Sequence, residues 1–404
     1  MQMIVIGNPG NRRTAGIQSA RAKLGLPPAY EVRYLDLLQR KTSLTESVHR
    51  LGLKTEEPLL LRLDAPGEHF DVERELIALG APDVEPDKFG SLHRSADFPE
   101  AAVVQPLSRR MALALQEHKG KLYHPSQWFR GYCRLLAELD GEAKQLWQRP
   151  GWMNAPMDIA AMFDKRQTHK VLTSAGVPVP KLLSPPDAIP DYETLRSIMK
   201  QRRMNRIFAK LAFGSGACGV IAYQTNPTTG AEVAVTTIGV DNFIAKPPIY
   251  YNVKKLVRYT DSRMIRQIVN WLLRHGAHIE QWIPKASYDG QSFDIRQLVV
   301  AGQSCHSAAR VSRTPITNLH LRSERKSLNE VGLTASEENE IRSCAERALE
   351  AFPESTIAGI DIALSAGSRR PFVLDVNPYG DLLYHIRHEG YDPYEWEMKQ
   401  LAGP

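Results

Sequence analysis

Cysteine and long hydrophobic runs are scarce in this sequence of 404 residues. Its 4 cysteines are dispersed, with no CxxC pair and no cluster at zinc spacing: Cys133, Cys218, Cys305 and Cys344. This excludes a disulfide scaffold and a zinc ribbon, and it fits a reducing cytoplasm. No apolar stretch approaches the roughly 18 residues that a membrane-spanning helix needs. The N-terminal MQMIVIGNPGNRR places its apolar residues before its arginines, the reverse of a signal peptide. We therefore expect a cytoplasmic protein with no membrane partner.

Charge of one sign is not in large excess either. The chain has 51 Lys and Arg against 45 Asp and Glu, a net charge of +6. This balance favours an anionic partner such as ATP or a carboxylate, and nucleic acid is not expected because interleaved aromatic and basic stripes are missing. The content of 43% hydrophobic and 24% charged residues excludes a disordered chain, and the length favours two or three domains.

The N-terminal part alternates strand and helix patterns. Strands are predicted at 3–7, 32–35 and 59–63, and helices at 15–24, 70–81 and 128–139. This alternation predicts an α/β domain with a partly parallel, Rossmann-like sheet. Arg62 and Asp64 come at the end of the third strand, where open sheets bind ligands, so they either face a substrate or form a structural turn.

The rest of the chain divides at a Pro, Gly and Trp-rich stretch near residue 150. We expect domains at 1–150, 151–260 and 261–404. Helices are predicted over 157–175, over 262–274 with Thr260 or Asp261 as N-cap, and after the capping box of Thr334 and Glu337. The segment 225–261 is either a substrate-specific elaboration or a long surface hairpin.

A glycine-rich segment lies between two predicted strands, at 207–212 and 220–224. Gly214, Gly216 and Gly219 have GxGxxG spacing, but a dinucleotide fingerprint requires a helix after the last glycine. The glycines are therefore expected at the tip of a hairpin, where backbone N–H groups can contact phosphate and Lys210 can supply a positive charge. A glycine-rich hairpin with a surface lysine is the alternative.

Acidic and basic side chains occupy four other predicted strands. Asp361 lies in one strand, and Asp375 and Asn377 lie two residues apart in the next, so both project from one face. These oxygen donors suit one or two Mg²⁺ ions, or else belong to a buried salt-bridge cluster. Arg296 and Arg310, also on strands, could clamp a phosphoryl group or an acidic substrate, or pair with carboxylates such as Asp294 and Asp361.

Over roughly residues 154–380 these segments resemble the ATP-grasp superfamily, and their motifs are most similar to the glutathione synthetase and ribosomal-protein glutamate ligase branch. The resemblance implies a Rossmann-like pre-ATP-grasp domain on the substrate side, a central lobe with a glycine-rich loop, and a C-terminal lobe with a metal site. FDKRQTHKVLTSAGVPVP and EQWI resemble the first phosphate-contacting segment and the adenine hinge. The ATP-contacting residues implied are Lys165, Lys210, Gly214, Ser215, Gly216, Gly219, Glu280, Gln281, Trp282, Ile283 and Asp294.

The same resemblance implies catalysis and metal binding. Arg296 and Arg310, with Lys210, would face the γ-phosphate and an acyl phosphate, while Asp361, Asp375 and Asn377 would hold Mg²⁺. Position 375 is Asp where the family usually has the longer Glu. The implied activity is an ATP-dependent carbon–nitrogen ligase acting on a small-molecule carboxylate and amine, or on a peptide or protein. A homodimer is the common default for such a chain. A kinase on this fold and a non-catalytic ATP-binding or peptide-binding protein are the alternatives.

Overall fold

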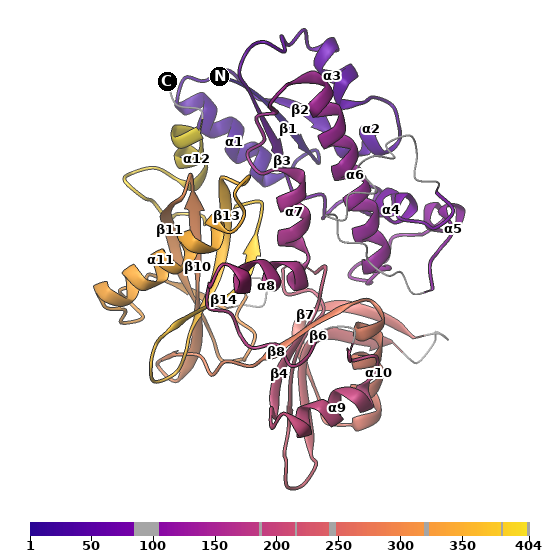
Figure 1. Ribbon diagram of the computed structural model, residues 1–404, viewed down its shortest axis with the longest axis vertical. Coiled ribbons are helices and arrows are strands. Elements are labelled where there is room, and N and C mark those ends of the chain that lie inside the picture. The colour runs from indigo at the N-terminus through magenta and orange to yellow at the C-terminus, as the bar shows by residue number, and fades with distance from the viewer. Residues whose placement is uncertain are drawn as a thin grey trace.

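The computed structural model describes residues 1–84, 105–185, 188–214, 216–241, 248–318, 323–380 and 383–401. Ser215 is therefore outside the described residues. The chain forms a mixed α/β structure with three sheets, each accompanied by helices (Figure 1). In Figure 1 the N-terminal sheet lies at the top, the central sheet at the bottom, and the C-terminal sheet beside them.

The N-terminal sheet is parallel, with strand order β2-β1-β3. Its strands are β1 (Gln2–Gly7), β2 (Tyr30–Arg33) and β3 (Leu59–Leu63). The helices of this region are α1 (Arg12–Lys23), α2 (Tyr34–Leu38), α3 (Leu44–Arg50), α4 (Phe70–Leu79), α5 (Arg109–Leu113) and α6 (Pro125–Leu146). The strand predicted over 32–35 is wrong at its end, because Tyr34 begins a helix and its buried hydroxyl donates to the backbone oxygen of Asp64 (2.7 Å).

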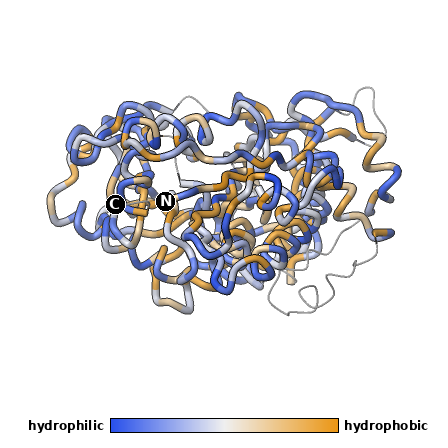
Figure 2. Tube along the Cα trace, turned by 90° about the horizontal axis from the view of Figure 1, so that it is seen from above, coloured by the Kyte–Doolittle hydropathy of each residue, from blue (hydrophilic) through white to orange (hydrophobic). Residues whose placement is uncertain are grey.

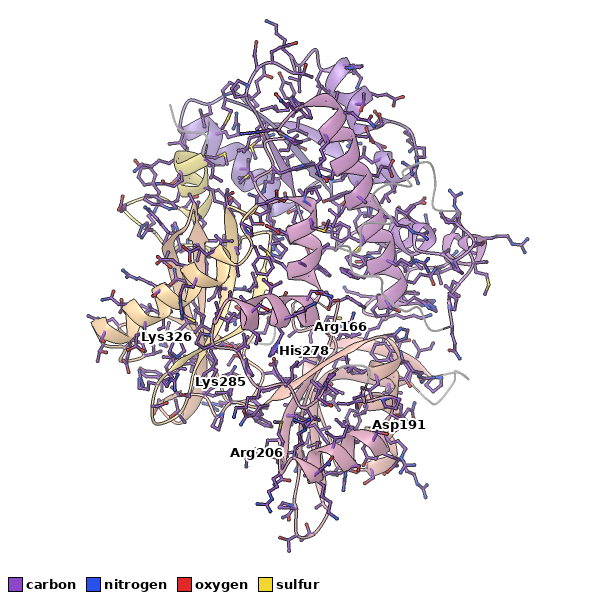
Figure 3. The ribbon with its side chains drawn as sticks, viewed as in Figure 1. Arg166, Asp191, Arg206, His278, Lys285 and Lys326 are labelled. Carbon is purple, nitrogen blue, oxygen red and sulfur yellow. The ribbon has the colours of Figure 1, made fainter. Side chains whose placement is uncertain are left out.

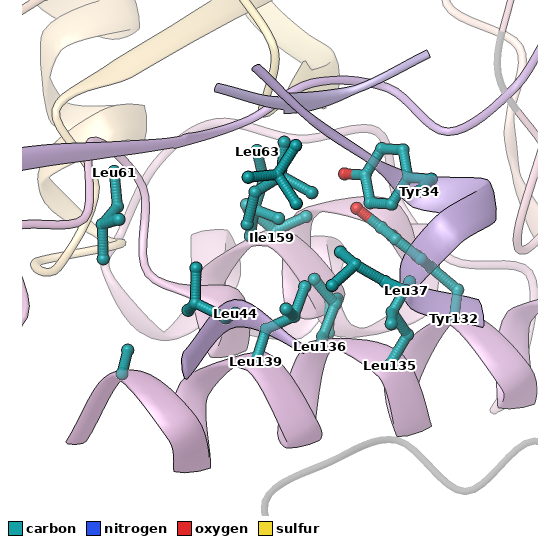
Figure 4. Packing of buried hydrophobic residues seen from close by; sticks show 14 of the residues in the cluster. Tyr34, Leu37, Leu44, Leu61, Leu63, Tyr132, Leu135, Leu136, Leu139 and Ile159 are labelled. Atoms are coloured by element: carbon teal, nitrogen blue, oxygen red, sulfur yellow. The ribbon is translucent and has the colours of Figure 1, made fainter. Parts of the chain in front are cut away.

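The long helix α6 supports this sheet from one side. Tyr132, Leu136 and Leu139 on α6 pack with Leu61 and Leu63 of β3 in one buried cluster (Figure 4). Helix α6 also crosses α4 at very close range. A Cβ atom added at Gly131 would lie 1.8 Å from the backbone oxygen of Leu76, so only glycine allows this approach.

Two helices stand where one was predicted over 157–175. These are α7 (Pro156–Phe163) and α8 (Lys165–Ser174). The break falls at Asp164, which leaves helical geometry and caps α8 by accepting from the backbone N–H of Arg166 (3.0 Å). Consequently Lys165 is the first residue of a helix, instead of a residue in the middle of one.

The central sheet is antiparallel, with order β7-β6-β5-β4-β8. Its strands are β4 (Arg206–Leu211), β5 (Val220–Thr225), β6 (Glu232–Asp241), β7 (Ile249–Tyr259) and β8 (Ala277–Gln281). The sheet shares a buried core with α9 (Tyr192–Gln201) and α10 (Ser262–Arg274), and Asp261 caps α10 as predicted. The described part of 225–261 therefore extends the sheet by two long strands, β6 and β7.

The C-terminal sheet is also antiparallel, with order β12-β11-β10-β13-β14 and with β9 paired to β10. Its strands are β9 (Ser287–Tyr288), β10 (Gln291–Val300), β11 (Gln303–Ser312), β12 (Glu324–Lys326), β13 (Ile357–Leu364) and β14 (Pro371–Asn377). Helix α11 (Ala335–Glu350) covers it and begins at the predicted capping box of Thr334 and Glu337. The last helix, α12 (Pro393–Leu401), contacts α1, so the two ends of the chain lie close together (Figure 1).

A buried ion cluster joins the N-terminal sheet to α12. Arg62 Nε lies 2.9 Å from Asp64 Oδ1, and Arg62 Nη1 lies 2.7 Å from Glu397 Oε2. Both contacts are enclosed, so the structural alternative for Arg62 and Asp64 accounts for their positions. Hydrophobic and hydrophilic segments alternate along the chain (Figure 2), and no helix among the described residues is both long and apolar enough to cross a bilayer.

Candidate functional site

A cavity with an empty volume of about 720 Å³ lies between the central and C-terminal sheets; we refer to it as the first cavity. One part of its wall is apolar and includes Phe208, Val220 and Ile316. The other part carries charged side chains from α8 and from strands of both sheets. Figure 3 labels His278 and Lys285 in the region where the two sheets meet. An apolar surface next to convergent charges is typical of a nucleotide site.

Lys210 projects from β4 into the first cavity. Its Nζ atom lies 2.5 Å from Glu280 Oε1 on the neighbouring strand β8 and donates to the backbone oxygen of Leu374 (3.2 Å). Burial alone would lower the pKa of Lys210, but the charges of Glu280 and Asp375 outweigh it and raise the pKa. The lysine is therefore held as a cation.

Glu280 has its carboxylate fixed from two sides. His278 Nε2 lies 2.8 Å from its second oxygen, and Lys210 contacts the first. Burial opposes ionisation, yet Lys210 and His278 together lower the pKa of Glu280 to about 2. In the structure the Glu280 side chain is the ion-pair partner of Lys210. The resemblance to the adenine hinge did not imply this contact.

Lys165 reaches the same cavity from the first turn of α8. Its Nζ atom lies 2.7 Å from Asp375 Oδ2 on β14, and its backbone N–H donates to Ala212 (3.0 Å). The break at Asp164 makes this possible, because a helix continuing through 164 would not begin at Lys165. Two lysines from different elements therefore approach one group of carboxylates.

Arg310 and its neighbours form a linked ion network across β11, β10 and β13. Arg310 Nε lies 2.8 Å from Asp294 Oδ1, Arg310 Nη2 lies 2.9 Å from Asp361 Oδ1, and Arg296 Nη1 lies 3.1 Å from that same oxygen. Strand register explains the network, because Asp294 is opposite Arg310 and Arg296 is opposite Asp361. The predicted alternative of ion pairs with Asp294 and Asp361 is present in the structure.

The acidic members of this network differ in pKa. Burial raises the pKa of Asp361, and the nearby Asp294 and Asp375 add to the effect against the pull of Arg296 and Arg310. The pKa of Asp294 falls to about 2, because Arg310 and Lys285 outweigh its burial. A further cation near Asp361, in addition to Arg296 and Arg310, would therefore be favourable.

The three predicted metal ligands, Asp361, Asp375 and Asn377, lie on β13 and β14. Asp361 and Asp375 are directly opposite each other on β13 and β14 and both line the first cavity. Asp361 Oδ1 is buried and, among the described residues, accepts no hydrogen bond with good geometry. Asn377 lies farther along β14, and its amide nitrogen donates to Gly359 (3.0 Å). The two aspartates fit a hard cation such as Mg²⁺, although no cluster of three acidic, His or Cys residues occurs in the described ranges.

The glycine-rich segment forms the β4–β5 hairpin that was predicted, with Lys210 opposite Val220. Gly219 has a positive φ of 65°, and a Cβ there would lie 2.3 Å from the side chain of Leu211. Gly214 lines the first cavity. The tip of the hairpin therefore borders the first cavity at Gly214, where no side chain covers the backbone.

A second cavity, with an empty volume of about 1900 Å³ that is partly open to solvent, adjoins the first. The N-terminal region, the glycine hairpin and the C-terminal sheet all contribute to it. Gly214, Cys218, Arg310 and Asn318 line both cavities, so the two spaces meet at these residues. Arg296 and Asn377 line the second cavity.

Most predicted site residues come together in these two spaces. The first cavity is lined by Lys165, Lys210, Gly214, Glu280, Gln281, Ile283, Asp294, Arg310, Asp361 and Asp375. The second contains Gly214, Gly216, Arg296, Arg310 and Asn377. Of the predicted residues that the structure describes, Trp282 and Gly219 line neither cavity. The Trp282 ring packs beside Phe208 (5.2 Å between centroids), and its backbone N–H donates to Arg206 (3.2 Å).

Sequence reasoning missed Lys285 and Thr317, which also line the first cavity. Lys285 Nζ lies 3.0 Å from Asp294 Oδ2 and donates to Thr317 Oγ1 (2.5 Å). Burial lowers the pKa of Lys285 despite the attraction of Asp294. The available signal was a lysine directly after EQWIP, the segment that resembles the adenine hinge.

No protein-family model matches this sequence, and no curated protein sequence matches it. The fold is nevertheless similar to solved structures. One is the ATP-grasp ligase PsnB complexed with a phosphomimetic variant of its minimal precursor, Mg and ADP (TM-score 0.51, 13% identity, covering 99% of this chain and 97% of that chain). Another is the D-cycloserine synthetase DcsG (TM-score 0.50, 10% identity, covering 100% and 99%). The chain therefore has the ATP-grasp fold.

Proposed function

We propose that this chain is an ATP-dependent ligase that joins a carboxylate to an amine through an acyl phosphate. The observation that carries the proposal is that three cations line one cavity with three carboxylates, where Lys165 pairs with Asp375, Lys210 with Glu280 and Arg310 with Asp361. The ATP-grasp fold agrees with it, since the two similar structures are named as a ligase and a synthetase. No side-chain nucleophile is needed for this chemistry.

The first cavity suits ATP. Its apolar wall would take the base beside Glu280 to Ile283, and Lys165, Lys210 and the backbone of the glycine hairpin would take the phosphates. Both lysines contact carboxylates, so phosphate would compete with Asp375 and Glu280 for them. Asp294 would act through Arg310, which it holds at 2.8 Å.

Mg²⁺ would be held by Asp361 and Asp375, with Asn377 at the edge of the site. When bound it would neutralise charge on the phosphate oxygens. The residues Arg296 and Arg310 already contact Asp361, and they would orient this carboxylate and turn their remaining N–H groups toward the second cavity.

In the proposed reaction a substrate carboxylate oxygen attacks the γ-phosphorus of ATP, and the bond from that phosphorus to the β,γ-bridging oxygen breaks, releasing ADP. Arg296 and Arg310 bind the oxygens of the transferred group. An amine then forms the carbon–nitrogen bond, and phosphate leaves. The wide second cavity has room for an amino acid, a peptide end or another small molecule.

We also propose the domain organisation expected from the sequence. Residues 1–150, 151–260 and 261–404 would be a Rossmann-like substrate-side domain, a central lobe and a C-terminal lobe. The parallel sheet β2-β1-β3 and the two antiparallel sheets support this division. The protein would work in the cytoplasm on a soluble carboxylate and amine.

The activity is tested by ADP release from ATP and Mg²⁺ with a panel of carboxylates, namely the twenty L-amino acids and a hexapeptide pool, using hydroxylamine as the amine. We expect Lys210→Ala and Asp361→Ala each to lower kcat/KM by about 100-fold or more, as for loss of a preorganised charge. Lys170→Ala, an exposed lysine on α8, is the control and should match the wild type. Wild-type turnover in both site variants would show that the site is wrongly assigned.

Oxygen-18 in the carboxylate separates a ligase from a kinase. In an acyl phosphate the oxygen between carbon and phosphorus comes from the carboxylate. When the amine displaces phosphate, this labelled oxygen leaves with the phosphate. A kinase acting on a hydroxyl leaves the carboxylate label in place, so unlabelled phosphate would contradict the ligase proposal.

A further inference from the structure

The second cavity is strongly basic. Only two carboxylates among the described residues line it, those of Glu68 and Glu73. The cationic side chains that line the same space are Arg12, Arg13, Lys121, Arg296, Arg310 and Arg325. The reaction described above uses Arg296 and Arg310, which contact Asp361. The other four cations have no part in it.

These four cations are not neutralised by the protein itself. Within the described ranges, none of them forms an ion pair with a carboxylate. Arg325 Nη1 donates to the backbone oxygen of Tyr384 (2.6 Å), and Lys121 Nζ lies 4.7 Å from the centre of the Tyr123 ring. The Nε atom of Arg13 is enclosed and has no hydrogen-bond partner in the described part of the chain. Enclosed donors normally have a partner, and a guanidinium group binds anionic oxygens most strongly.

Arg12 and Arg13 lie where the N-terminal sheet is suited to bind a ligand. In the strand order β2-β1-β3, the strand after β1 lies on one side of it and the next strand on the other. Open α/β sheets bind ligands in the crevice at the carboxyl end of the strand where the order reverses, which here is β1. Residues 11–13 after β1 and 65–67 after β3 line the second cavity, so this crevice opens into it.

Hydrogen bonds fix the start of α1 against the segment after β3. Thr14 Oγ1 donates to Asp64 Oδ2 (2.8 Å), and Asn8 Nδ2 donates to the backbone oxygen of Pro66 (2.9 Å). Both Asn8 and Thr14 are buried. Arg13 is therefore attached to backbone that is held in place, and the N-terminal end of α1 adds a partial positive charge beside it.

We propose that the carboxylate substrate carries a second anionic group, and that Arg13 and Arg12 bind this group while the reacting carboxylate lies at Arg296 and Arg310. This inference rests on the proposed ligase function. A substrate with one negative charge would leave the cations of the N-terminal region without a counter-charge, whereas a second anionic group complements them. Lys121 and Arg325 add to the positive potential that attracts such a substrate.

The substrate class is accordingly a dicarboxylate, or a carboxylate that also bears a phosphate group. Both present anionic oxygens that a guanidinium group binds through two N–H donors. The second group does not react, so it would contribute to substrate binding and selectivity, and Arg12 and Arg13 would determine specificity.

The experiment compares donors in matched pairs whose members differ in one anionic group. The pairs are glutamate with glutamine, aspartate with asparagine, and O-phosphoserine with serine. Each is supplied as the free L-amino acid and as the central residue of an otherwise neutral hexapeptide. ADP release is measured with ATP, Mg²⁺ and hydroxylamine, and the ratio of kcat/KM within a pair gives the preference for the extra charge.

The full-length proteins compared are wild type, Arg13→Gln, Arg12→Gln and the control Arg50→Gln. Arg50 ends α3, is exposed and lines neither cavity. Arg12 is also exposed, so its replacement leaves the packing of the fold unchanged and keeps the test valid if Arg13→Gln folds poorly.

Wild type should prefer the anionic member of at least one pair by about 10-fold or more, as for charge-assisted hydrogen bonds. We expect Arg13→Gln to lower this ratio by about 10-fold and Arg12→Gln to lower it as well, mainly through KM, because the group they bind does not react. Arg50→Gln should keep the wild-type ratio. A preference confined to the phosphoserine pair would identify the second group as phosphate, and one confined to the other pairs would identify it as carboxylate.

Two results would overturn the inference and leave the ligase proposal intact. One is a wild type that uses the neutral member of every pair as well as, or better than, the anionic one. The other is a wild-type ratio retained by both Arg13→Gln and Arg12→Gln, including the case in which both members of a pair lose turnover equally. No ADP release by wild type with any donor would overturn the ligase proposal itself.

Discussion

Replacing Glu280 by glutamine removes a charge from the wall of the first cavity and leaves the shape of the side chain almost unchanged. Lys210 then loses the partner 2.5 Å away, and His278 loses the carboxylate at 2.8 Å. His278 is buried and the Lys210 side chain is only 12% exposed, so water replaces the lost contact only in part. We expect a marked loss of stability at neutral pH.

The size of this loss follows from the pKa of Glu280. The folded protein lowers it from 4.5 to about 2, which corresponds to about 3 kcal/mol of stabilisation of the ionised form. Because the folded value is below the unfolded one, this contribution is present above about pH 4.5 and is lost as the pH falls toward 2. The free energy of unfolding of Glu280→Gln should therefore be about 3 kcal/mol lower than that of the wild type at neutral pH, and this difference should shrink below pH 4.5.

Urea unfolding followed by tryptophan fluorescence measures this difference at several pH values. Glu193→Gln is the control, because Glu193 pairs with Arg266 at the surface with both side chains more than half exposed. An exposed pair contributes about 1 kcal/mol or less. A change below about 1 kcal/mol for Glu280→Gln at neutral pH, or a difference that does not depend on pH, would refute the reasoning.

Two further substitutions test the packing of the fold. Gly131→Ala should lower the free energy of unfolding by about 2 kcal/mol or more. The new Cβ atom would lie 1.8 Å from the backbone oxygen of Leu76, and this strain exceeds the roughly 1 kcal/mol by which alanine is favoured over glycine in a helix. An unchanged melting temperature would contradict the close crossing of α4 and α6. Thr334→Ala removes the cap of α11 and should cost about 1 kcal/mol in urea unfolding. An equal loss in Ser108→Ala, which caps the short surface helix α5, would contradict a special role for the α11 cap.

Local sequence patterns predicted many of the elements. β3 (Leu59–Leu63) and α10 (Ser262–Arg274) have the predicted bounds, because apolar periodicity and side-chain caps act over a few neighbouring residues. The capping box at Thr334 was readable for the same reason. The α7–α8 break was not, since Asp164 lies inside a periodic apolar pattern and becomes a cap through its own buried contacts with Arg166.

Some residues of the candidate site were likewise predictable from the sequence, and others were not. The acidic pattern around Asp361 and Asp375 and the glycines after Lys210 were visible as residues that do not suit ordinary strands. Lys285 was missed because its partner Asp294, although only nine residues away, is on β10, and their contact depends on the path of the chain between them.

By itself the sequence determined the type of many strands and helices and which charged residues are out of place in them, because these depend on side-chain periodicity and local hydrogen bonds. Only the tertiary structure decided which charges meet. Lys165 and Asp375 are 210 positions apart, and Arg62 and Glu397 are 335 positions apart. These contacts depend on how the three sheets pack around the two cavities. That packing is driven by burial of apolar surface over the whole chain, so no local sequence pattern predicts it.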